Sequence, residues 1–294
     1  MGVSELVDSW EIALKTERKA PSTIRVYTGS VRIYLDWSTT NGLPAEIDRR
    51  QVQLWIADLL DSGAEATTVK VRQGALRRFS AWLADERETD TDPLLGLKAP
   101  KIDVKVVEPL TELELQAMLK TCDRKTFTGI RDEALIRFMN ETVVRAGEVI
   151  AMTPADLNVT AGTAIIRRGK GGKGRLVAYG PKTAQALDRY QRARRRHRHA
   201  DVPALWLAQR GPTFGYWSLR KTLSARATRA GVIGFHLHKT RHTGATRWLA
   251  AGGSEGGLMA VAGWTQRSML DRYTKATAEA RAAEESHRLD LGEL

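Results

Sequence analysis

The chain has 294 residues, of which 42% are hydrophobic and 27% are charged, and its formal net charge is +12. This composition is typical of a soluble globular protein with room for two domains. The chain lacks both a run of about 18 apolar residues and the apolar core of a signal peptide, so we expect neither a membrane span nor secretion. Cys122 is the single cysteine, which excludes an internal disulfide and fits a reducing cytoplasm.

The positive charge is confined to the second part of the chain. Residues 1–105 carry 15 Lys and Arg against 16 Asp and Glu, whereas residues 106–294 carry 31 against 18. This distribution favours a polyanionic partner, with a solubilising surface as the alternative. The stretch Arg189–His199 holds six arginines and two histidines, which favours contact with a DNA backbone over a merely solvated face.

Apolar periodicity predicts a helical domain over residues 1–95. The expected helices are 3–15, 21–39, 48–61 and 66–85. The second and fourth of them carry cations on one face, namely Arg25, Lys70, Arg72 and Arg77. These side chains are candidates for contact with a DNA groove, or they belong to a solvated face.

Residues 96–108 are expected to form an extended linker, because glycine and prolines interrupt a segment without helical period. A helix then begins at Thr111, with Glu114 completing a capping box. Residues 109–294 are predicted to be mixed α+β and mostly helical. Strands at 163–168 and 175–179 flank a glycine-rich turn, and the expected helices are 111–120, 130–144, 181–197, 218–230, 240–251, 255–262, 268–273 and 276–287.

Arg145 lies three residues before Glu148, so the two share a face if the segment is helical. They form a surface ion pair, or Glu148 orients the planar guanidinium toward a phosphate. Lys170 lies in the glycine-rich turn, whose spacing does not match a P-loop. It is a solvated lysine or a mobile donor that protonates a leaving oxygen. Lys173 and Arg175 are further candidates for DNA contact.

His238 and Arg241 are also three residues apart and share a helical face. With His242 they form a basic cluster, but no carboxylate or cysteine lies near them in the sequence, so we expect no metal. An arginine beside a histidine suits a phosphate oxygen and its proton transfers. Trp264 is a core residue or an indole N–H donor, and Tyr273 is a candidate nucleophile only in the company of these residues.

Five blocks in this order resemble the catalytic domain of the tyrosine recombinases, the phage integrase family: TVVRAGEV, GKGGKGRLV, HKTRHTGAT, AGW and SMLDRYTK. The resemblance covers residues 108–280, and residues 1–95 are similar, less specifically, to that family's core-binding domain. It implies a mainly α fold, with a small β-hairpin in the catalytic domain at 109–294 and a tail helix at its end. Because the helices begin almost at Met1, we expect a compact integrase without an arm-binding domain.

Six positions match the family's catalytic residues, in chain order Arg145, Lys170, His238, Arg241, Trp264 and Tyr273. The resemblance implies that the two arginines hold the scissile phosphate and that the lysine protonates the leaving oxygen. It further implies that the histidine assists proton movement and that the tyrosine forms a 3′-phosphotyrosine. A histidine is commoner at the position of Trp264, so hydrogen bonding and packing remain there but proton transfer is excluded.

The implied function is site-specific cutting and rejoining of DNA without a cofactor, in the integration and excision of a prophage. The implied partners are double-stranded DNA attachment or core sites, further copies of the chain in a tetramer on two duplexes, and an accessory directionality factor. The implied location is the cytoplasm of a bacterial host, near the nucleoid. The alternatives are a chromosome-dimer resolvase, a transposon recombinase, a type IB topoisomerase and a catalytically inactive DNA-binding relative.

Overall fold

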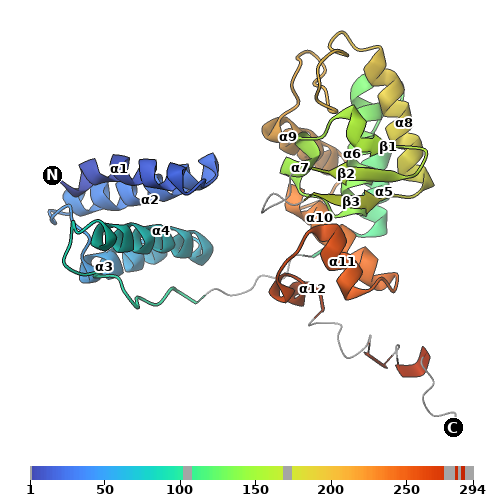
Figure 1. Ribbon diagram of the computed structural model, residues 1–294. Helices are drawn as coiled ribbons and strands as arrows, with labels where there is room; N and C mark the ends of the chain where they lie inside the picture. The colour runs from blue at the N-terminus through green and yellow to red at the C-terminus, as the bar shows by residue number, and fades with distance from the viewer. Residues whose placement is uncertain (1, 102–107, 168–173, 275–281, 284–285, 289–294) are drawn as a thin grey trace. The chain divides into compact units, whose positions relative to one another are not determined.

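The computed structural model describes residues 2–101, 108–167, 174–274, 282–283 and 286–288. The chain divides into two compact units, Met1–Lys105 and Val106–Leu294, each with a hydrophobic core of its own (Figure 1). The division falls within the predicted linker, and the domain limits given above stay a prediction. Among the helices that the structure describes, none combines the length and apolar character that crossing a membrane requires.

The first unit is a bundle of four helices: α1 (Val3–Thr16), α2 (Pro21–Thr40), α3 (Arg49–Asp61) and α4 (Ala66–Asp85). These bounds match the helices predicted from periodicity, because one apolar stripe of each helix faces the common core. The core is rich in aromatic rings. Trp10 lies against Phe79 with ring centroids 5.1 Å apart, and Tyr34 lies against Trp55 at 5.3 Å.

The second unit is mostly helical. Its helical elements are α5 (Glu112–Lys120), α6 (Phe127–Thr142), α7 (Ala146–Ile150), α8 (Pro181–Arg195), α9 (Tyr216–Arg229), α10 (Leu237–Ala250), α11 (Glu255–Ala262) and α12 (Asp271–Thr274), with 3₁₀ turns η1 (Pro154–Asp156) and η2 (Arg267–Met269). Helix α6 is central, since it packs against α5, α8, α9 and α10. The capping box of Thr111 and Glu114 at the start of α5 is present as predicted.

A three-stranded antiparallel sheet completes the second unit, in the order β1 (Leu157–Asn158), β2 (Thr163–Ile166) and β3 (Arg175–Ala178). The predicted hairpin is confirmed, with Ile166 opposite Arg175 in the pair nearest the connecting turn. Strand β1 was not predicted, because two residues carry no recognisable period. The turn at 168–173, which contains Lys170 and Lys173, lies outside the described residues. The predicted class, mainly α with a small sheet, is confirmed.

Two predicted helix limits in the C-terminal part were wrong. The helix expected from Thr240 begins at Leu237, so that His238 lies within its first turn. The helix expected at 268–273 is divided into η2 and α12, because Leu270 separates two short turns. The predicted tail helix at 276–287 lies mostly outside the described residues.

Candidate active site

Helix α6 ends at Thr142, three residues before Arg145, the first of the predicted catalytic arginines. Val143 caps the helix in the left-handed conformation, with φ +56° and ψ +22°, and its side chain is fully buried. The sequence predicted that the helix continues to Val144, and this was wrong. A left-handed non-glycine residue costs about 1–2 kcal/mol, because its Cβ crowds the following carbonyl. The turn directs the Val143 carbonyl to Arg241, whose Nη1 donates to it at 2.6 Å.

Arg145 is the N-cap residue of α7, and Glu148 stands at the third position of that helix. The backbone N–H of Arg145 donates to Oε2 of Glu148 at 2.8 Å, and its Nη1 donates to Oε1 at 2.9 Å. The side chain of Glu148 is 4% exposed and that of Arg145 is 28% exposed. The guanidinium is therefore held on its inner side and accessible on its outer side. This is the arrangement that an orienting role for Glu148 requires.

Arg241 lies on α10 and is buried. Its Nη2 donates to the carbonyl of Ala262 at 2.6 Å, and its guanidinium lies 5.2 Å from the ring centre of Trp264. Burial, and then the charge of Arg145, lower the pKa of Arg241 to about 10. Its hydrogen bonds to carbonyls leave the cation without the full compensation that a carboxylate would give. A phosphate anion would supply that compensation.

The C-terminus of α11 brings the two arginines together. Arg241 donates to the carbonyl of Ala262, and Nη2 of Arg145 donates to the next carbonyl, that of Gly263, at 3.3 Å. The last carbonyls of a helix lack intrahelical donors and carry the negative end of its dipole, so they attract cations. Gly263 adopts φ +62°, which ends the helix at a conformation that glycine tolerates.

Tyr273 lies between two other rings. Trp264 stacks on it with centroids 5.2 Å apart and 23° between the planes, and His242 lies 4.9 Å away at 38°. His238 in turn contacts His242 at 4.7 Å. The structure thus brings together Arg145, Arg241, Trp264, Tyr273 and, through His242, His238. No catalytic part was predicted for His242, although its position beside Arg241 and four residues after His238 was a signal.

The predicted DNA contacts of the first unit lie on α2 and α4. A shallow cavity of about 420 Å³ between these helices is lined by Arg25 and Arg72, together with exposed Val26 and Val71. Lys70 and Arg77 are exposed on α4. These positions stay candidates for DNA contact. Arg175 differs from them, because its side chain is directed into the protein.

The basic stretch Arg189–His199 serves the fold more than the sequence suggested. Arg194 is buried and its guanidinium donates to a set of loop carbonyls, those of Ala200, Val202, Ala204 and Leu205. Arg189 pairs with the buried Glu133, and Arg192 pairs with Asp188. Arg194 is therefore engaged within the fold, and contact with a DNA backbone stays a prediction for the exposed arginines of the stretch, Arg195, Arg196 and Arg198.

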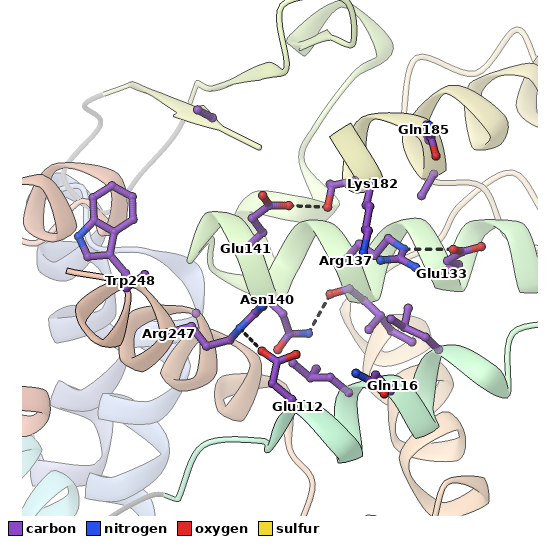
Figure 2. Close-up of a pocket in the computed structure, with 18 of the residues that line it drawn as sticks. Glu112, Gln116, Glu133, Arg137, Asn140, Glu141, Lys182, Gln185, Arg247 and Trp248 are labelled. Atoms are coloured by element: carbon purple, nitrogen blue, oxygen red, sulfur yellow. Dashed lines mark hydrogen bonds and ion pairs between the residues drawn. The ribbon is translucent and has the colours of Figure 1, made fainter. Parts of the chain in front are cut away.

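A cavity of about 1100 Å³ lies between α5, α6, α8 and α10 (Figure 2), and neither Arg145 nor Arg241 lines it. Several of its charged side chains form ion pairs. Glu133 pairs with Arg137, and Glu112 pairs with Arg247. Apolar side chains, including that of Trp248, complete its wall. The cavity is therefore separate from the phosphate-binding candidates and suits a partner of mixed polarity.

The sequence profile of the phage integrase family matches residues 108–280, and that of the phage integrase N-terminal SAM-like domain matches residues 7–87. The chain belongs to the phage integrase family and is a tyrosine-type site-specific recombinase. The tyrosine recombinase XerC of Oceanobacillus iheyensis is 27% identical, over 93% of this chain and 92% of that protein. The tyrosine recombinase XerD of Bifidobacterium longum is 27% identical, over 95% and 94%.

The fold is shared with solved structures of the family. The structure of the Tn1549 transposon integrase in complex with circular intermediate DNA superimposes with a TM-score of 0.75 and 16% identity, over 96% of this chain and 99% of that chain. At this identity the likeness concerns the fold.

Proposed function

We propose that this recombinase exchanges DNA strands through a covalent 3′-phosphotyrosine at Tyr273. The observation that carries the proposal is the pairing of Arg145 and Arg241 on consecutive carbonyls at the end of α11. The next residue along the chain, Trp264, stacks on Tyr273. Two fixed cations and an aromatic nucleophile therefore converge on one small region of the second unit.

The chemistry follows from these residue types. The Tyr273 oxygen attacks the phosphorus, the bond to the 5′-oxygen breaks, and a 3′-phosphotyrosine forms. Negative charge develops on the non-bridging oxygens, where Arg145 and Arg241 are aimed, and each such donor is typically worth about 3–4 kcal/mol. Lys170 protonates the leaving 5′-oxygen, and His238 assists removal of the tyrosine proton. The arginines supply the charge that a metal ion would otherwise supply.

Rejoining is the same reaction in reverse. A 5′-hydroxyl attacks the phosphotyrosine, Lys170 takes back its proton, and Tyr273 is released. One phosphodiester is exchanged for another through an ester of similar energy, so no nucleotide cofactor is required. This balance allows exchange between two duplexes as readily as resealing of one.

The partner in this proposal is double-stranded DNA. The excess positive charge lies in the second unit, and the Tn1549 integrase that shares the fold was solved in complex with DNA. Four protomers on two duplexes would carry out a full exchange, with an accessory factor setting direction. The tail after Tyr273 would then dock on a neighbouring protomer, and the cavity between α5, α6, α8 and α10 offers a place for it.

Deletion of residues 277–294 tests this assembly. We expect the truncated chain to bind a single site with normal affinity and to fail in pairing two duplexes, measured by gel mobility on one and two sites. Recombination at the full rate by the truncated chain would refute the docking of the tail. Trp248→Ala in the cavity wall is the matching change on the acceptor side, and it is expected to weaken pairing alone.

Two biological roles remain within this mechanism. A prophage integrase was the first expectation, and a chromosome-dimer resolvase was the principal alternative. The relatives named XerC and XerD match over nearly their whole length, which favours the resolvase-type organisation. The trapped DNA decides between them, because a resolvase acts on a chromosomal site and an integrase on a pair of attachment sites.

Covalent trapping tests the chemistry. The chain is mixed with a library of nicked duplexes in EDTA, and adducts that survive SDS are measured and their DNA is sequenced. We expect adducts with the wild type and none with Tyr273→Phe. Retained DNA binding without any adduct in the wild type would overturn the proposal and would favour a DNA-binding relative without catalysis.

A further inference from the structure

Arg175 is the first residue of β3, and its side chain is 10% exposed. Its Nη1 and Nη2 donate to Oε1 and Oε2 of Glu148 at 2.9 and 2.7 Å, and its Nε donates to the carbonyl of Val261 at 2.5 Å. Two parallel hydrogen bonds fix the relative orientation of a guanidinium and a carboxylate. A side chain held in this way cannot reach DNA without abandoning a buried carboxylate.

We propose that Arg175 is a positioning residue for the catalytic arginines and not a DNA contact. The inference rests on the proposed function, because it concerns the geometry of Arg145 in strand cleavage. Each oxygen of Glu148 accepts two hydrogen bonds, one from Arg145 and one from Arg175. Arg175 thereby fixes the plane of the carboxylate that in turn holds Arg145.

The charges of the cluster support this division of roles. Arg145 and Arg175 bind the carboxylate of Glu148, and Arg241 interacts with it electrostatically, so among these described residues the positive charge exceeds the negative. Burial raises the pKa of Glu148, but hydrogen bonds from Arg175 and Arg145 outweigh burial and hold it below its ordinary value. Glu148 is therefore ionised, and Arg175 neutralises it. The charges of Arg145 and Arg241 are then left for a phosphate.

Arg175 also connects three segments of the site. Glu148 belongs to α7, Val261 to α11, and Arg175 itself to β3. The guanidinium lies directly against Gly263, since a Cβ added there would come within 3.2 Å of its Nη1. The carbonyls at the end of α11 that hold Arg145 and Arg241 are thus placed against β3 by one side chain.

The loss of this residue has a specific expected effect. In Arg175→Gln, Glu148 keeps its charge and has Arg145 as its remaining arginine partner, so the carboxylate draws Arg145 away from the phosphate. A misplacement of about 1 Å at a reacting group costs about 100-fold in rate. We expect the rate of covalent adduct formation at saturating protein to fall about 100-fold, while affinity for the same DNA is unchanged.

Two further variants define the control and the conservative change. Arg167 follows β2 and pairs with the buried Asp156, so Arg167→Gln removes an arginine from another buried carboxylate, although Arg167 itself is 61% exposed. We expect it to lower the unfolding temperature without slowing cleavage. Arg175→Lys keeps the charge but lacks the planar fork, so it should fold and recover only part of the rate. If Arg175→Gln does not fold, Arg175→Lys carries the comparison.

A double-mutant cycle tests whether Arg175 acts through Glu148. We expect Arg175→Gln and Glu148→Gln to be non-additive, with the double variant cleaving no more slowly than the slower single variant. Multiplied losses would show independent roles and would overturn the inference.

A DNA contact would behave differently. Arg175→Gln would then bind DNA more weakly, with the salt slope of the binding constant reduced by about one, and would cleave at the normal rate once saturated. That result would also overturn the inference. Wild-type protein that forms no adduct would instead refute the proposed function, so the two failures are distinguishable.

Discussion

Trp264 stacks on Tyr273, with ring centroids 5.2 Å apart and an angle of 23° between the rings. The same indole lies 5.2 Å from the guanidinium of Arg241. One side chain therefore contacts both the proposed nucleophile and one of the proposed phosphate ligands. This contact gives Trp264 a role that needs no proton transfer, which suits a position where a histidine is the commoner residue.

Substitution of Trp264 should slow cleavage in proportion to the contact that is lost. An aromatic pair is worth about 0.5–1.5 kcal/mol, so Trp264→Ala should reduce the rate of adduct formation by roughly ten-fold. Trp264→Phe keeps a ring against Tyr273 and should lose less. Trp217→Ala is the matched control, because Trp217 is 71% exposed on α9. Equal losses for Trp264→Phe and Trp264→Ala would assign the effect to the indole N–H.

At Val143 a glycine variant should be at least as stable as an alanine variant, which reverses the usual order of stability. At φ +56°, alanine keeps the left-handed penalty of about 1–2 kcal/mol and glycine does not, so Val143→Gly should be at least as stable as Val143→Ala. At the neighbouring Val144, whose φ is not positive, glycine should be less stable than alanine by about 0.5–1 kcal/mol. Urea unfolding measures all four variants. A less stable Val143→Gly would contradict the strained turn.

The free energy of unfolding of the second unit should depend on pH through the ionisation of Glu133. Burial raises the pKa of Glu133, but hydrogen bonds from Arg124 and Arg137 outweigh burial, and the pKa lies below its ordinary value of 4.5. The unfolded chain therefore binds the proton first, and the stabilisation is complete above about pH 4.5 and is lost as the pH falls through the folded pKa.

The Glu133→Gln variant measures how much the ionised carboxylate stabilises the protein. Glu133→Gln should lower the free energy of unfolding by about 1–3 kcal/mol at pH 7, as expected for hydrogen bonds to a charged group, and the difference should shrink in acid. Asp188→Asn is the control, because Asp188 and its partner Arg192 are both about half exposed. A constant difference between Glu133→Gln and wild type across this range would show that Glu133 does not titrate as inferred.

Arg25 and Arg72, which line the shallow cavity between α2 and α4, should contribute to DNA affinity through phosphate contacts. Arg25→Ala and Arg72→Ala should each weaken binding and reduce the salt slope of the binding constant by about one. Arg32 lies on the same helix as Arg25 but pairs with Asp8 at 2.7 Å, so Arg32→Ala should leave the slope unchanged. If Arg25→Ala and Arg72→Ala keep the salt slope of the wild type, these side chains belong to a solvated face and do not contact DNA.

Much of the fold was predictable because its signals are local. The helices of the first unit follow from apolar periodicity, and the capping box at Thr111 follows from two residues three apart. The end of α6 was not predictable in this way. Val143 is a poor residue for a left-handed turn, and its conformation is imposed by burial and by the hydrogen bond to Arg241. Strand β1 is too short to show a period.

The sequence by itself determined the two-unit helical plan, the family and the identity of the six candidate catalytic positions, since motif order and spacing are properties of the chain. Only the tertiary structure showed which arginines bind partners inside the protein and which are exposed. Arg175 and Arg194 look like surface charges in the sequence, but one holds Glu148 and the other satisfies loop carbonyls. The reason is physical: the partner that neutralises a buried cation comes from a distant segment, and only folding brings the two together.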